Sequence, residues 1–225
     1  HIKKEKIIVK KYDSDICLIF QYHNLEIPFK DKDSLDFYNF ENKNIAKGLV
    51  KLVKYTIKFC IKNNMKLTVP LKRDKKYSPL AHEFEIDFLK RNLNNKEEFD
   101  YIRENLLEKN QEGYTSFKAV VNSKITVSTF STLLRDKLSV GGKILSCNLT
   151  KIDRYNFPFE GICTLNNCSY EEFEKRLIDI YSMSKEDYFS KVEEEPNYIM
   201  KFNKDISTIS LIKKKLLELG VSTNK

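Results

Sequence analysis

Long hydrophobic runs are missing from this chain of 225 residues. A helix that crosses a bilayer needs roughly 18 consecutive apolar residues, and no run approaches that length. The N-terminal residues also lack the basic and then apolar pattern of a signal peptide. We therefore expect a cytoplasmic protein without a membrane span.

Paired cysteines and metal-binding spacings are lacking too. The five cysteines form an odd set without a Cys-x-x-Cys pair, and the three histidines do not fall at the spacing of a metal site. This pattern predicts free, buried thiols in a reducing compartment and no bound metal.

Several motifs of common enzyme classes are absent. The chain contains no Gly-x-Gly-x-x-Gly loop, no Gly-Lys-Ser of the Walker type and no Gly-x-Ser-x-Gly elbow. A dinucleotide loop, a P-loop and a hydrolase nucleophile therefore find no support, and no set of nucleophile, base and acid is recognisable.

What is present is an alternation of strand and helix patterns. Short, continuous apolar runs are typical of buried parallel strands, and helical spacing follows most of them. Strands are predicted at 16–22, 66–71 and 162–165, with a weaker one at 100–102, and residues 124–148 are predicted to form one strand–helix–strand unit. Helices are predicted at 44–63, 81–94, from 169, from 184 and at 206–219.

No Asn-Gly or Asp-Gly hairpin signal interrupts this alternation. The sequence therefore predicts a single α/β domain, Rossmann-like, with a mainly parallel sheet flanked by helices. Residues 24–42 read as a polar loop. The last helix is expected to bury Ile209, Ile212 and Leu216.

Positive charge is in excess, with 40 Lys and Arg against 32 Asp and Glu, a formal charge of +8. Nucleic acid, an acidic membrane face or an anionic substrate would each suit this balance. However, many lysines lie at helical spacing on one predicted face, as at positions 47, 51, 54, 58 and 62, which is typical of a solvated helix surface. Because no known DNA- or RNA-binding motif is present, nucleic acid is not an expected partner.

A hydroxyl-rich turn joins the strand at 124–128 to the next helix. It carries Ser128, Thr129, Ser131 and Thr132. Open amides at a helix N-terminus, together with the helix dipole, favour a phosphate, and Ser131 suits the N-cap position. The alternative is that Ser131 is only a cap and its neighbours are ordinary strand residues.

Other polar residues are expected at the same edge of the sheet, because the carboxyl ends of parallel strands lie together. Lys72 and Arg73 follow the second strand and would neutralise a diphosphate, unless they belong to a solvated basic loop. His23, after the first strand, is a weak candidate for a general base or a hydrogen-bond donor. Asp136, one helical turn after the hydroxyls, would bind a ribose or only complement the helix dipole.

These residues also carry a resemblance. Ser131-Thr-Leu-Leu-Arg-Asp136 followed by Gly142-Lys-Ile-Leu-Ser-Cys-Asn148 resembles the Ser-Thr-x-x-x-Glu…Gly-Lys-Lys-Val-Leu block of bacterial surface-polysaccharide glycosyltransferases of the GT-B architecture. In that family the block lies in the C-terminal, Rossmann-like domain, which binds the nucleotide sugar. The resemblance covers about residues 113–219 and is loose over the first hundred.

The resemblance implies a metal-independent transferase that moves a sugar from a nucleotide-sugar substrate to a glycan or glycolipid acceptor, with no cofactor. Ser131 and Thr132 would contact the donor phosphates, and Asp136, where the family usually has Glu, would contact the ribose. Residues 1–225 would then be a donor-binding domain from the C-terminal part of a longer chain, working near the inner face of an anionic membrane. The alternative is a non-catalytic α/β domain that binds a nucleotide or a protein partner. A nucleic-acid binder, supported by charge alone, is the third hypothesis.

Overall fold

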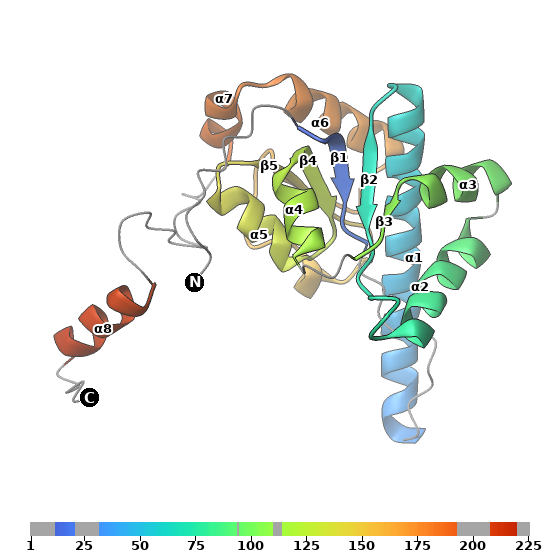
Figure 1. Ribbon diagram of the computed structural model, residues 1–225, viewed down its shortest axis with the longest axis horizontal. Coiled ribbons are helices and arrows are strands. Elements are labelled where there is room, and N and C mark those ends of the chain that lie inside the picture. The colour runs from blue at the N-terminus through green and yellow to red at the C-terminus, as the bar shows by residue number, and fades with distance from the viewer. Residues whose placement is uncertain (1–11, 21–31, 94, 110–113, 193–207, 220–225) are drawn as a thin grey trace.

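Six parallel strands form one sheet in the order β3-β2-β1-β4-β5-β6 (Figure 1). The computed structural model describes residues 12–20, 32–93, 95–109, 114–192 and 208–219. The strands are β1 (Ser14–Leu18), β2 (Leu67–Pro70), β3 (Leu106–Leu107), β4 (Ser123–Ser128), β5 (Lys143–Asn148) and β6 (Thr164–Asn166). Every ladder between them is parallel.

The helices fill the connections and the C-terminal part. They are α1 (Lys32–Lys62), α2 (Pro79–Asn92), α3 (Lys96–Glu104), α4 (Thr115–Val121), α5 (Thr132–Ser139), the 3-10 helix η1 (Asp153–Tyr155), α6 (Tyr170–Ser182), α7 (Lys185–Ser190) and α8 (Thr208–Glu218). The predicted α/β class with a parallel sheet is confirmed, and the strand order is that of a Rossmann-like fold.

The direction in which the chain advances along the sheet decides which helices cover each of its two faces. From β1 it proceeds to β2 and β3 on one side, and from β4 it proceeds to β5 and β6 on the other. Because such crossovers are right-handed, the helices that connect the strands of the two halves cover opposite faces. Accordingly α1 packs with α3 on one face, where α6, which follows the last strand, also packs against α1, whereas α4 and α5 pack together on the other face (Figure 1).

The strands of the second half are almost completely enclosed. All six residues of β5 are buried, and five of the six in β4. In β1 the side chains alternate, so that Ile16 and Leu18 belong to the main core while Cys17 joins Val120 of α4 in a smaller cluster. The five cysteines are free and buried, as predicted.

Two buried lysines tie helix ends to the sheet. Lys137 of α5 donates from Nζ to the carbonyl oxygens of Val120, Val121 and Ser123, at 2.8, 3.0 and 2.6 Å. Lys143 of β5 donates in the same way to carbonyl oxygens at the end of α6. A cation at a helix C-terminus satisfies carbonyls that have no partner within the helix and complements the helix dipole. Burial lowers the pKa of Lys137 to about 8.

Two expectations about local structure were wrong, and one helix was not anticipated. Residues 100–102 lie in α3 rather than in a strand: Asn95 caps that helix by accepting from the amide of Glu97, and acidic residues occupy its first turn. The helix expected from residue 44 begins at Lys32, inside the predicted loop. The short helix α4 was not anticipated.

The apolar face of α8 was also predicted wrongly. Ile209 and Ile212 are 67% and 53% exposed, and Leu216 is only partly buried. Helical spacing identifies which residues share a face, but it does not say whether that face finds a partner. None of the described helices is both long and apolar enough to cross a membrane.

Candidate functional site

The candidate site lies where the two halves of the sheet meet. Strands β1 and β4 are neighbours, and the chain leaves them toward opposite sides of the sheet. In open α/β sheets, ligands bind beyond the carboxyl ends of the strands at this switch point. The hydroxyl-rich elbow between β4 and α5, residues 128–132, therefore occupies the position where the fold favours a ligand.

A cavity of about 200 Å³ opens at this edge, and we call it the edge cavity. Its polar lining combines lysines that follow β2 and β3 with Ser and Thr residues of α4 and the elbow. The lining residues are Ile19, Phe20, Pro70, Lys72, Lys109, Ser116, Ser131, Thr132 and Leu133. Three residues predicted from the sequence, Lys72, Ser131 and Thr132, are thus brought together.

The start of α5 supplies backbone donors to the cavity. Ser131 is the N-cap, and its Oγ accepts from the amide of Leu133 at 3.3 Å. The amide of Thr132, the first residue of the helix, has no partner inside the helix, and Thr132 itself is exposed. An anion here would face this amide and the positive end of the helix dipole.

Ser128 and Thr129 do not line the cavity. The Oγ of Ser128 donates to the carbonyl of Ile19 at 3.0 Å, which links the ends of β4 and β1. The carbonyl of Thr129 accepts from Ser146 at 2.9 Å, while its buried Oγ1 has no partner among the described residues. The hydroxyl of Ser128 and the backbone carbonyl of Thr129 therefore bind neighbouring strands, whereas Ser131 and Thr132 line the cavity.

A buried carboxylate shapes the turn that carries Lys72. Glu85 of α2 is fully buried and accepts from the amides of Lys72 and Arg73 at 3.1 and 3.0 Å. Burial raises the pKa of Glu85. Burial also lowers the pKa of Lys72, and the charge of Arg73 adds to that effect. Arg73 does not line the cavity, and its Nε is buried without a partner in the described part of the chain.

Sequence reasoning missed Lys109, Ser116 and the clamping role of Glu85. Lys109 follows β3, which has two residues and no strand pattern that a sequence could reveal. Ser116 belongs to α4, the helix that was not anticipated. Glu85 looked like an ordinary acidic residue near the start of a helix. Its amide partners lie 13 and 12 residues earlier in the chain, a separation that no local sequence pattern records.

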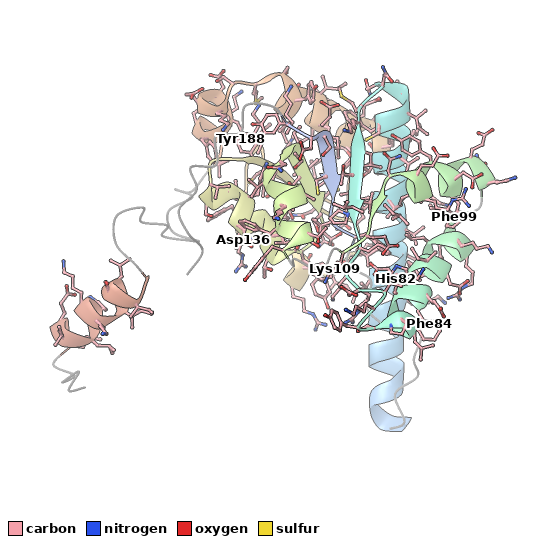
Figure 2. All side chains as sticks on the ribbon, in the orientation of Figure 1. His82, Phe84, Phe99, Lys109, Asp136 and Tyr188 are labelled. Carbon is pink, nitrogen blue, oxygen red and sulfur yellow. The ribbon has the colours of Figure 1, made fainter. Side chains whose placement is uncertain are left out.

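A second hollow of about 290 Å³ adjoins the first and shares Lys109 with it. Its acidic groups are engaged: Asp74 accepts from the amides of Lys76 and Tyr77, and Glu108 contacts Nε2 of His82 at 2.9 Å. Figure 2 shows Lys109 and His82 near each other at the end of the sheet where α2 begins. The lysines of this edge therefore add a positive potential next to the edge cavity.

The two remaining candidates are not brought to the cavity. Asp136 lies one turn along α5 and is not among the lining residues. Partial burial raises the pKa of Asp136, which Figure 2 labels at α5. His23 lies outside the described residues. A ribose contact by Asp136 and a base function for His23 stay predictions.

Comparisons with models of protein families, with curated proteins and with solved structures found no match. The chemistry of the site must therefore be judged from its own groups. Two lysines, three residues with hydroxyl side chains and the N-terminus of α5 line one small cavity. The described lining residues include no Asp, Glu or His, so the composition of the lining favours an anion as ligand.

Proposed function

We propose that this domain binds the diphosphate of a nucleotide sugar in the edge cavity and serves as the donor-binding half of a glycosyltransferase. The observation that carries the proposal is the convergence of Lys72, Lys109 and the Ser131-Thr132 turn at the switch point of a Rossmann-like sheet. The resemblance of residues 131–148 to surface-polysaccharide glycosyltransferases supplies the reaction class.

In this reaction the bond between the anomeric carbon and the donor diphosphate breaks while an acceptor hydroxyl attacks. Negative charge grows on the leaving nucleoside diphosphate. Lys72, Lys109 and the amide of Thr132 would stabilise that charge in fixed positions, which lowers the barrier because the dipoles need no rearrangement. The acceptor, a glycan or a glycolipid, and a base for its hydroxyl would be held outside the edge cavity.

A second candidate is a non-catalytic nucleotide-binding domain. Two observations favour it: the lining offers no base, and the cavity of about 200 Å³ is smaller than the roughly 300 to 1,000 Å³ of typical ligand sites. It would hold a diphosphate and leave the sugar and base on the surface. This function needs the same anion site but no acceptor.

Calorimetric titration of the whole chain with UDP, GDP and CMP tests both candidates. We expect saturable binding of at least one nucleotide, and roughly tenfold or greater loss of affinity in Lys109→Met and in Ser131→Ala/Thr132→Val, since each removes donors to a charged phosphate. Lys175→Met, an exposed lysine of α6 outside both hollows, is the matched control and should bind normally.

Two further measurements separate the hypotheses. Sugar release or transfer from the bound nucleotide sugar would identify the enzyme, whereas binding without turnover would favour the non-catalytic domain. Tight, salt-dependent binding of a short oligonucleotide without any nucleotide binding would contradict both and favour a nucleic-acid partner.

A further inference from the structure

Helix α8 carries an apolar surface that faces solvent. Ile209, Ile212, Leu216 and Leu219 recur at spacings of three and four residues and so share one face, which we call the α8 stripe. Ile209, Ile212 and Leu219 are 67%, 53% and 68% exposed. Scattered apolar side chains on a surface are ordinary, but a contiguous exposed patch marks an interaction site.

Lysines border this stripe on both sides. Lys213 lies four residues after Ile209, and Lys215 lies four residues before Leu219, so that they flank the stripe along opposite edges. Lys214 lies on the opposite face, and all three lysines are exposed. Within α8 the acidic side chain is that of Glu218, which pairs with Lys215 at 3.1 Å. Residues 201–225 contain six lysines against one Asp and one Glu.

We propose that α8 docks in the interface of an anionic lipid membrane, with the α8 stripe among the acyl chains and its lysines at the headgroups. An apolar face bordered by lysines is the pattern of helices that lie in the plane of a bilayer. The long lysine side chains place their stems along the apolar surface and their ammonium groups in the headgroup layer. The helix is too short and too basic to cross the membrane, so the contact is peripheral.

Charge complementarity favours lipid over a second copy of the chain. Two α8 stripes packed face to face would bring the flanking lysines of both helices together, and like charges oppose that arrangement. One 11-residue helix also offers far less area than the roughly 1,200 Å² or more of a stable protein interface. Anionic headgroups instead neutralise the lysines while the acyl chains cover the stripe.

Sedimentation of the whole chain with vesicles tests this docking. We expect binding to vesicles of phosphatidylcholine with phosphatidylglycerol, and much weaker binding to phosphatidylcholine alone. Ile212→Asp/Leu216→Asp should reduce binding by roughly tenfold or more, and Lys213→Ala/Lys215→Ala by roughly fivefold for each lysine. Ile178→Asp on α6 is the matched control, because Ile178 is an apolar side chain that is 46% exposed outside the stripe, and it should leave binding unchanged.

Three results would overturn the proposal. The first is the absence of binding to anionic vesicles, and the second is binding by Ile212→Asp/Leu216→Asp that equals binding by the native chain. The third is a dimer in sedimentation velocity that the same double variant abolishes, because a second copy of the chain would then cover the stripe. Circular dichroism of each variant establishes that the fold is retained. Because α8 contributes no residue to the edge cavity, vesicle binding and nucleotide binding fail independently.

Discussion

The hydroxyls of the elbow have separate roles at the residue scale. Ser128→Ala should lower the free energy of unfolding by about 1 kcal/mol, because the carbonyl of Ile19 loses its donor, while nucleotide affinity stays unchanged. Ser131→Ala should cost a similar amount through the lost N-cap and should also weaken binding. Urea denaturation and calorimetry on both variants measure the two effects. Loss of binding in a folded Ser128→Ala protein would show that the elbow acts differently.

Lys137 is a second residue with a defined role. Lys137→Met should lower the free energy of unfolding by about 2 to 4 kcal/mol, because three buried carbonyls lose their donor. Lys175→Met, a change of the same kind on an exposed lysine, should stay within about 0.5 kcal/mol. Equal effects of the two substitutions would contradict the capping role.

The lowered pKa of Lys137 also predicts a pH dependence. Between its folded value of about 8 and its ordinary value of 10.5, the folded protein has released a proton that the unfolded chain still holds. The resulting stabilisation is complete above 10.5 and is lost as the pH falls through 8. The stability difference between the native protein and Lys137→Met should therefore be larger at about pH 10 than at about pH 7. A difference that shrinks with rising pH would contradict this.

Residue roles could be predicted only where a local pattern encodes them. The cap function of Ser131 and the capping box of Ser169 with Glu172 are readable because both partners lie within three residues. Glu85 accepts from amides of the loop after β2, and Lys109 reaches the cavity from the end of β3. Both arrangements depend on contacts between separate segments of the chain. No periodicity records such contacts, and so the sequence identified three of the nine residues that line the edge cavity.

At the scale of elements, α1 comes very close to the loop after β5. A Cβ added to Gly48 would lie 2.7 Å from the amide nitrogen of Thr150 and 2.8 Å from the carbonyl carbon of Leu149. Overpacking of this kind costs about 1 to 3 kcal/mol. Because alanine favours a helix over glycine by about 1 kcal/mol, Gly48→Ala should lower the free energy of unfolding by up to about 2 kcal/mol.

Thermal or chemical unfolding of Gly48→Ala and of Lys47→Ala measures this effect. Lys47 is the exposed neighbour of Gly48, and its substitution should change the free energy of unfolding by no more than about 0.5 kcal/mol. Stabilisation by Gly48→Ala would mean that helix propensity outweighs the contact and that α1 does not pack as closely as described.

Elements were predictable in proportion to their length and periodicity. The strands β2, β4 and β5 and the helices α5 and α6 were found within a few residues. The weak strand expected at 100–102 proved to be part of α3, because Phe99 and Ile102 at helical spacing pack inward. Short elements such as β3 and α4 owe their structure to tertiary contacts.

For the whole molecule, α8 should contribute little to folding. A chain that ends before Thr208 should keep its free energy of unfolding within about 0.5 kcal/mol, because the exposed apolar face of α8 buries little surface. Urea denaturation measures this. A cooperative loss of stability on removing α8 would show that its apolar face is buried against the fold.

As the contrasting case, Tyr188→Phe removes the hydroxyl that accepts from the amide of Ile144 and donates to its carbonyl. This substitution should lower the free energy of unfolding by about 1 to 3 kcal/mol.

The central claim is that the edge cavity binds a diphosphate, and titration of the isotope-labelled chain with pyrophosphate tests it most directly. We expect saturable shifts of the backbone amide signals of Lys72, Thr132 and Leu133, and their loss in Lys109→Met. Shifts confined to the lysines of α8, or shifts at the cavity that do not saturate, would contradict the account.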